Sequence, residues 1–104
     1  MKFLVVTKSR QALPMEAAGP LLEAMRAWAK QGLASKKLEQ VWSFAGIPGG
    51  GGIVNVASLE ELDALMTESP LSQFSDTQIY ALTDLDKALN NALGALKRMT
   101  PPKS

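Results

Sequence analysis

Residues 38–61, LEQVWSFAGIPGGGGIVNVASLEE, decide the fold because they predict two strands, the link between them and the start of a helix. Residues 38–45 place large apolar side chains at alternate positions, which is typical of a strand. Residues 47–52 are interpreted as a glycine-rich turn, and the apolar residues 53–56 as the next strand. Two strands joined by so short a link predict an antiparallel hairpin.

A helix is expected to start directly after this hairpin. Ser58 and Glu61 have the spacing of a capping box, in which each side chain accepts from a backbone N–H at the helix start. The helix is expected to end before Pro70, because proline disfavours a helical conformation in the preceding residue. Its buried face is predicted to consist of Leu59, Leu62, Leu65 and Met66.

The N-terminal part of the chain predicts a strand and a helix. Residues 3–7 are almost all apolar, which indicates a strand buried on both faces. Residues 19–32 predict a helix with Pro20 in its first turn, and this proline is expected to separate the helix from a turn at residues 14–18. The apolar stripe of the helix consists of Leu21, Leu22, Met25, Trp28 and Ala29.

The C-terminal part predicts a loop, a strand and a helix. Residues 71–76 are expected to form the loop, and residues 77–82 the fourth strand. Thr83 and Asp86 have the spacing of a second capping signature, and residues 100–104 are expected to be a disordered tail. The last helix has one apolar face, made of Leu85, Leu89, Ala92, Leu93 and Leu96.

The element order is β-α-β-β-α-β with an extra C-terminal helix, which predicts an α+β fold with one ferredoxin-like domain over residues 1–99. Two helices normally cover one face of such a sheet. Residues 3–7 are apolar on both faces, however, and Trp42 and Phe44 lie on the opposite strand face from Val41. We therefore expect the second face to pack against the sheet of another copy, which predicts a homodimer.

Composition excludes several classes of protein. The chain has 104 residues, is 46% hydrophobic, and has a formal charge of +1, which gives no reason to expect nucleic acid or an anionic membrane as a partner. Residues 53–56 also lack the aromatic rings that stack bases in an RNA-recognition domain. There is no run of about 20 apolar residues, and residues 3–6 are too short for a signal-peptide core, so no membrane and a cytoplasmic location are expected.

The sequence has no cysteine and no histidine. Disulfides, thiolate catalysis, imidazole catalysis and metal sites built from these side chains are therefore excluded, and no metal is expected. Any proton transfer has to use Asp, Glu, Lys, Tyr or a water molecule.

The glycine run at residues 49–52 invites comparison with a phosphate-binding loop. Such a loop leads into a helix N-terminus, often with Lys and Ser or Thr behind the glycines. Here the run leads into an expected strand without those residues. It is interpreted as a hairpin turn, or as a turn whose bare backbone borders a ligand pocket.

Two aromatic residues and one amide are candidate ligand-binding residues. Trp42 and Phe44 share a strand face, where they form either core or dimer packing or the walls of an apolar pocket. Asn55 interrupts an apolar strand, and a buried amide there needs a hydrogen-bond partner. That partner is either backbone near the glycine run or a ligand carbonyl.

Three polar residues are candidate catalytic groups. Lys8 and Tyr80 are expected near a sheet face, either solvated or donating to a ligand. Glu23 lies at helical spacing from Arg26 and Lys30, which indicates an exposed ion-pair ladder. If that ladder tilts toward the sheet, Glu23 becomes the best carboxylate for proton abstraction.

The chain contains VWSFAG at residues 41–46, VNVASLEEL at residues 54–62 and SPL at residues 69–71, together with Asp76 and the start at residues 1–5. These stretches resemble muconolactone Δ-isomerases. The resemblance implies a dimeric α+β barrel, often built into larger rings, with the last helix reaching across to a neighbour. It also implies cofactor-free movement of a proton and a double bond within a small unsaturated lactone. That chemistry needs a base beside the acidic C–H and a donor beside the developing enolate.

The resemblance also implies site residues, and the chain departs from some of them. The family's isomerases have a histidine just after the Ala-Gly turn, where this chain has Ile47. The carboxylate of the first helix would fall near Met25, and Glu23 lies about half a turn away. The hypothesis is a muconolactone isomerase-like protein that handles a small hydrophobic lactone or carbonyl compound without a cofactor. Glu23 would be the base, Lys8 or Tyr80 the donor, and Trp42, Phe44, Ile47 and Asn55 the ligand-binding residues. The alternatives are a non-catalytic small-molecule-binding or oligomeric partner protein of the same fold, or a cofactor-free monooxygenase-like protein.

Overall fold

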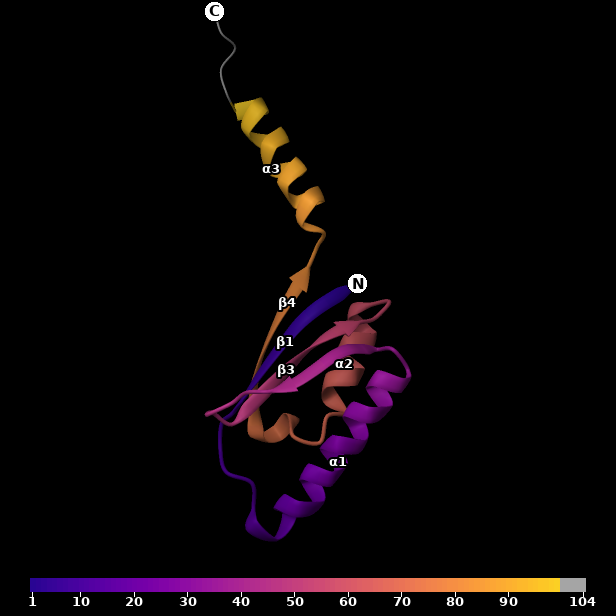
Figure 1. Cartoon of the computed structure of the whole chain (residues 1–104), viewed down its shortest axis with the longest axis vertical. Coiled ribbons are helices and arrows are strands. Elements are labelled where there is room, and N and C mark those ends of the chain that lie inside the picture. Colours follow the sequence, from indigo (N-terminus) through magenta and orange to yellow (C-terminus); the bar gives the residue numbers. More distant parts are fainter. Residues whose placement is uncertain (100–104) are drawn as a thin grey trace, which may run out of the picture.

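The computed structural model describes residues 1–99, and the expected tail at residues 100–104 lies outside the described residues. The predicted α+β fold and its element order are confirmed, with one additional 3-10 turn, η1 (Figure 1). The elements are β1 (Lys2–Ser9), α1 (Met15–Ala34), β2 (Leu38–Ser43), β3 (Gly49–Asn55), α2 (Leu59–Thr67), η1 (Ser72–Phe74), β4 (Ser75–Leu82) and α3 (Leu85–Met99).

The four strands form one antiparallel sheet in the order β2-β3-β1-β4. Helices α1 and α2 lie on the same side of this sheet (Figure 1). Apolar side chains from β1, β2, β3 and α2 form the core between them, because each of these elements turns one apolar face inward. The buried core consists of Phe3, Val5, Leu38, Val54, Val56, Leu62 and Leu65, with Trp28 and Met66 packed against it.

The glycine run lies inside a strand, so its interpretation as the hairpin turn was wrong. Gly50, Gly51 and Gly52 pair with β1 on one side and with β2 on the other. The strands approach so closely here that a Cβ on Gly51 would lie 2.6 Å from the Val5 carbonyl oxygen. Pairing with two neighbouring strands outweighs the turn preference of glycine, and the turn is displaced to residues 44–48.

Helix α1 is continuous through Pro20, so the predicted break at that residue was wrong. Pro20 lies near the N-terminus of the helix and is exposed. Its missing N–H leaves the Glu16 carbonyl without an intrahelical donor, but water can solvate that carbonyl at an exposed position. One lost hydrogen bond is therefore not enough to end the helix.

Ser58 is confirmed as the cap at the start of α2, and the reciprocal bond to Glu61 comes from the residue before the cap. The Ser58 side chain accepts from the Glu61 backbone N–H at 3.1 Å. The Glu61 carboxylate accepts in return from the Ala57 backbone N–H at 3.4 Å. At the start of α3 the cap is Asp84 and not Thr83, because the Asp84 carboxylate accepts from the Lys87 N–H at 3.0 Å.

Helix α3 projects away from the sheet beyond the end of β4, which gives the chain its 74 × 28 × 23 Å dimensions (Figure 1). Its apolar face is open to solvent, with Leu89 50% and Leu93 57% exposed. No helix in residues 1–99 has both the length and the apolar character needed to cross a membrane.

The sheet face opposite α1 and α2 is also apolar. Strand alternation places Leu4 and Val6 on this face, since Phe3 and Val5 belong to the core on the other side. Tyr80 lies opposite Leu4 in the register, and its side chain is 51% exposed. The expected apolar character of both faces is therefore present in the described residues.

Candidate functional site

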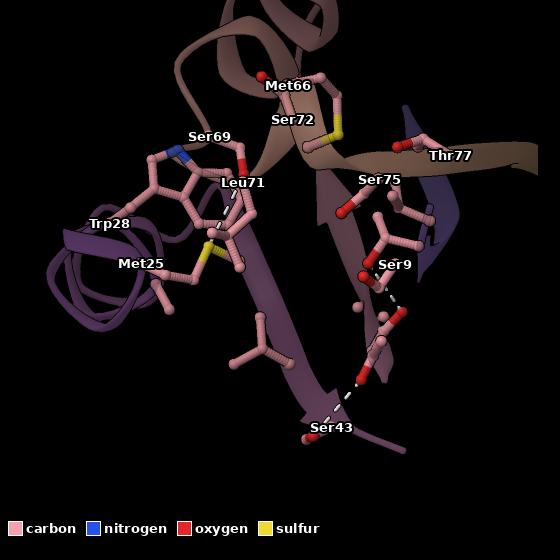
Figure 2. Close-up of a pocket in the computed structure, with 18 of the residues that line it drawn as sticks. Ser9, Met25, Trp28, Ser43, Met66, Ser69, Leu71, Ser72, Ser75 and Thr77 are labelled. Carbon is pink, nitrogen blue, oxygen red and sulfur yellow. Dashed lines mark hydrogen bonds between the residues drawn. The ribbon is translucent and has the colours of Figure 1, made fainter. Parts of the chain in front are cut away.

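A cavity of about 1170 Å³ lies between α1, the sheet and the segment that joins α2 to β4. Its volume slightly exceeds the ~300–1,000 Å³ that is typical of small-molecule sites in proteins. The segment is linked to the helix where the Ser69 hydroxyl donates to the Met25 sulfur at 3.7 Å. Figure 2 shows the cavity between Met25 and Trp28 on one side and the hydroxyl groups of β1 and β4 on the other.

The helix contributes an apolar wall. Leu22, Met25 and Trp28 recur at three-residue spacing along α1, so they project toward the same side and line the cavity. The Trp28 Nε1 atom is buried and has no hydrogen-bond partner within residues 1–99. Across the cavity Gly50 and Gly52 contribute no side chains to the sheet surface. The glycine run thus leaves the space that the cavity occupies.

Opposite the helix lies a row of hydroxyl side chains, which we call the hydroxyl wall and which consists of Thr7, Ser9, Ser75 and Thr77. Alternation along each strand puts all four on the cavity side, and the register pairs Thr7 with Thr77 and Ser9 with Ser75. The Thr7 hydroxyl donates to the Gly50 carbonyl at 3.2 Å, and the Ser9 hydroxyl donates to the Gln11 carbonyl at 3.0 Å.

Charged groups are nearly absent from the cavity walls. Among the described lining residues Arg26 is the one charged side chain, and none is Asp, Glu, Lys or Tyr. Arg26 is 66% exposed and lies 3.7 Å from the Glu23 carboxylate. Residues 1–99 also contain no cluster of acidic residues that could hold a metal ion.

The structure does not bring the three predicted catalytic residues together. Glu23 is 71% exposed and pairs with Arg26, although it is adjacent in sequence to the lining residue Leu22. Strand alternation puts Lys8 on the sheet face opposite Thr7 and Ser9. Tyr80 is likewise outside the cavity wall, and its hydroxyl donates to the Gln78 side chain at 3.1 Å.

Of the four predicted ligand-binding residues, Trp42 borders the cavity, but the register pairs it with Gly51 and pairs Gly51 with Val6, which places the Trp42 side chain on the sheet face opposite the helices. Its indole nitrogen lies 3.2 Å from the position that a Cβ on Gly51 would take. Phe44 and Ile47 lie outside the wall, and the Ile47 side chain is 50% exposed. The Asn55 amide donates to the Glu39 carboxylate at 3.1 Å, outside the cavity.

Sequence reasoning missed the hydroxyl wall. The signal was available, because Thr7 and Ser9 alternate along one strand and Ser75 and Thr77 along another. Single hydroxyl residues at strand ends are common, however, and only the register of β1 against β4 shows that these four meet.

The comparisons with known proteins identify a fold. The sequence matches no protein-family model, and it matches no curated protein sequence. The structure is similar to the crystal structure of a muconolactone isomerase, with a TM-score of 0.71 and 23% identity over 81% of this chain and 90% of that chain. It is also similar to 5-chloro-2-hydroxyhydroquinone dehydrochlorinase from Burkholderia phenoliruptrix AC1100, solved in complex with 2,5-dihydroxybenzoquinone. That likeness has a TM-score of 0.67 and 17% identity over 84% of this chain and 98% of that chain. The chain therefore has the muconolactone isomerase-like fold.

Proposed function

We propose that this chain is a divergent muconolactone isomerase-like protein that binds a small hydrophobic lactone or carbonyl compound between α1 and the sheet. The observation that carries the proposal is the cavity of about 1170 Å³ with an apolar wall on one side and a hydroxyl wall on the other. An apolar surface with a few placed polar groups is the usual form of a small-molecule site. A protein of the same fold has been solved with 2,5-dihydroxybenzoquinone, a small ring bearing oxygen atoms, which supports this ligand class.

The cavity favours binding over isomerisation as the function of a single chain. Hydroxyl groups can donate to a ligand carbonyl, which is one requirement for stabilising an enolate. The second requirement is a base within hydrogen-bond reach of the acidic C–H. The described lining residues contain no carboxylate or amine. Glu23, adjacent to the lining residue Leu22, remains the carboxylate that we propose for any proton transfer.

We also propose that the working unit is a homodimer, with a larger ring as an extension of it. Two apolar surfaces are partly exposed within the described residues, namely the sheet face with the half-buried Leu4 and Val6 and the exposed Tyr80, and the face of α3 with Leu89 and Leu93. A second copy offers the same two surfaces, so sheet can pack on sheet, and each α3 can lie on the partner. The fold likeness to muconolactone isomerase supports this arrangement.

Ligand binding is tested by isothermal titration calorimetry with a γ-lactone, 5-methylfuran-2(5H)-one, and a phenolic ester, methyl 4-hydroxybenzoate. We expect at least one of the two to bind the wild-type chain. Met25→Trp fills the cavity from α1 and should weaken that binding ~10-fold or more, since a larger ring displaces the ligand from the apolar wall.

Ala24→Trp is the matched control, because the adjacent residue is exposed and lies outside the cavity wall. Its affinity should stay within ~2-fold of wild type. Equal loss in both variants, or no binding by the wild-type chain, would remove the cavity as the ligand site.

A further inference from the structure

We infer that strand β4 pairs along its open edge with β4 of a second copy, so that two sheets join into one continuous sheet. This contact lies at the sheet edge, so it is distinct from the sheet-on-sheet packing of the proposed homodimer and does not depend on ligand binding. It follows from three features: the direction of the β4 backbone groups, the lack of edge protection on β4, and the protection of the opposite edge.

The hydrogen bonds at the end of β1 show which backbone groups of β4 face outward. The Arg10 N–H donates to the Phe74 carbonyl at 2.8 Å, one position beyond the last register pair of β1 and β4. In an antiparallel ladder, successive residues of a strand bond alternately to one side and to the other. Even-numbered residues of β4 therefore bond to β1, as Phe74 does. The N–H and C=O groups of Thr77, Ile79 and Ala81 point to the open edge.

The bonds on the other side of β1 agree with this assignment. The Ser9 N–H donates to the Pro48 carbonyl at 3.1 Å, and the Met1 carbonyl accepts from the Val56 N–H at 3.0 Å. Odd-numbered residues of β1 thus bond on the β3 side. Its even-numbered residues are left for β4, where the register sets them opposite the even-numbered residues of that strand.

Strand β4 is an edge strand that lacks the features that usually prevent pairing. It is last in the sheet order β2-β3-β1-β4, and residues 1–99 supply no strand beyond it (Figure 1). Natural proteins protect such edges with lysine, proline, a bulge or a very short strand. β4 is eight residues long, has no lysine or proline, and pairs with β1 without a register shift. Its one charged residue, Asp76, lies 3.5 Å from Arg10.

The opposite edge of the sheet is protected. β2 is six residues long, and its register against β3 shifts between Leu38 and Gln40. Glu39 lies at this irregularity, and its carboxylate is 3.1 Å from the Lys2 ammonium. A bulge bends an edge strand, and a charge on the edge opposes pairing. The contrast indicates β4, and not β2, as the strand that pairs.

Strand β4 is complementary to a second copy of itself. The outward groups belong to every second residue, so an antiparallel copy related by a two-fold axis presents its own outward groups at the same spacing. In the register centred on Ile79, Thr77 pairs with the partner's Ala81, and Ile79 pairs with the partner's Ile79. A second copy therefore satisfies the donors and the acceptors of the open edge together.

Amide hydrogen exchange on the wild-type chain at sub-millimolar concentration tests the pairing. An outward N–H exchanges rapidly unless another strand accepts its hydrogen bond. We expect the amides of Thr77, Ile79 and Ala81 to exchange ~100-fold or more slowly than the amide of Val41, which faces the open edge of β2. Exchange at Ile79 as rapid as at Val41 overturns the inference.

Val41 also separates the two possible partner strands. The Phe44 N–H donates to the Gly49 carbonyl at 3.0 Å, so the even-numbered residues of this part of β2 bond to β3 and the Val41 N–H faces away from it. If β4 paired with β2 of the second copy, the amide of Val41 would be as slow as that of Ile79. That result overturns β4 as the partner strand.

A pair of variants tests the same contact by sedimentation velocity. Ala81→Pro removes an outward N–H and keeps the bonds to β1, and proline is tolerated on an edge strand, whereas the control Ala81→Ser keeps the N–H. We expect Ala81→Pro to weaken self-association ~10-fold or more and Ala81→Ser to stay within ~2-fold of wild type. Circular dichroism establishes that both variants are folded.

Equal self-association of the two folded variants overturns the inference. Ligand binding and the contribution of α3 to the homodimer are measured with other substitutions, so this failure leaves the proposed function in place. If Ala81→Pro does not fold, the exchange rates of the wild-type chain decide the question.

Discussion

Helix α3 provides the sharpest test of the proposed homodimer, through the double substitution Leu89→Ala and Leu93→Ala. In the single chain these side chains are 50% and 57% exposed, so about half of each surface is left for a partner to bury. Full burial of a leucine contributes about 1.5–3 kcal/mol, so the part that Ala removes is worth about 1 kcal/mol at each position. Because a homodimer contains each substitution twice, we expect the pair to weaken dimerisation by about 4 kcal/mol, or roughly 1,000-fold in Kd. Sedimentation velocity over a concentration series measures this change.

The matched control is Asn90→Ala with Asn91→Ala, two substitutions on the polar side of the same helix. Both pairs introduce alanine, which has the highest helix propensity, so neither weakens α3 through the backbone. The control should leave the Kd within ~2-fold of wild type. A wild-type chain that is monomeric at tens of micromolar, or an equal loss in both double variants, would refute the reasoning.

Two further predictions concern the capping box and the position of the family histidine. Ser58→Ala should lower the free energy of unfolding by about 1 kcal/mol, because the Glu61 N–H loses its acceptor. The control Thr83→Ala should change the free energy of unfolding by less than about 0.5 kcal/mol. Urea denaturation of both variants measures these changes. Ile47→His should leave ligand affinity unchanged and should not produce lactone isomerisation, because Ile47 lies outside the cavity wall. A spectrophotometric assay with muconolactone checks this, and a gain of isomerisation would instead favour the catalytic hypothesis for the fold.

The residues of the candidate site could be predicted from the sequence only in part. Trp42 was predicted to form an apolar wall; it borders the cavity, and its role in ligand binding stays a prediction. Lys8 and Tyr80 were chosen as polar groups near a sheet face, but sequence alone does not say which face points toward the helices. That assignment depends on which side of the sheet α1 and α2 cover, and the roles proposed for these two residues and for Glu23 stay predictions.

The sequence alone determined the kinds of element and their order. These elements follow from local patterns, namely the capping residues Ser58 and Glu61, the apolar stripes of the helices and the apolar strands. Each pattern produces its element through contacts between residues that are close in the chain. The resemblance to muconolactone Δ-isomerases, seen in the same stretches, agrees with the fold that the structure has.

Only the tertiary structure decided that the glycine run forms part of a strand and where the hydroxyl wall lies. Glycine has a strong local preference for turns, and pairing with β1 and β2 overrode it at Gly50, Gly51 and Gly52. Thr7 and Thr77 are seventy positions apart along the chain, yet the β1–β4 register sets them side by side. Contacts at such separation depend on how whole elements pack, and no local pattern encodes them.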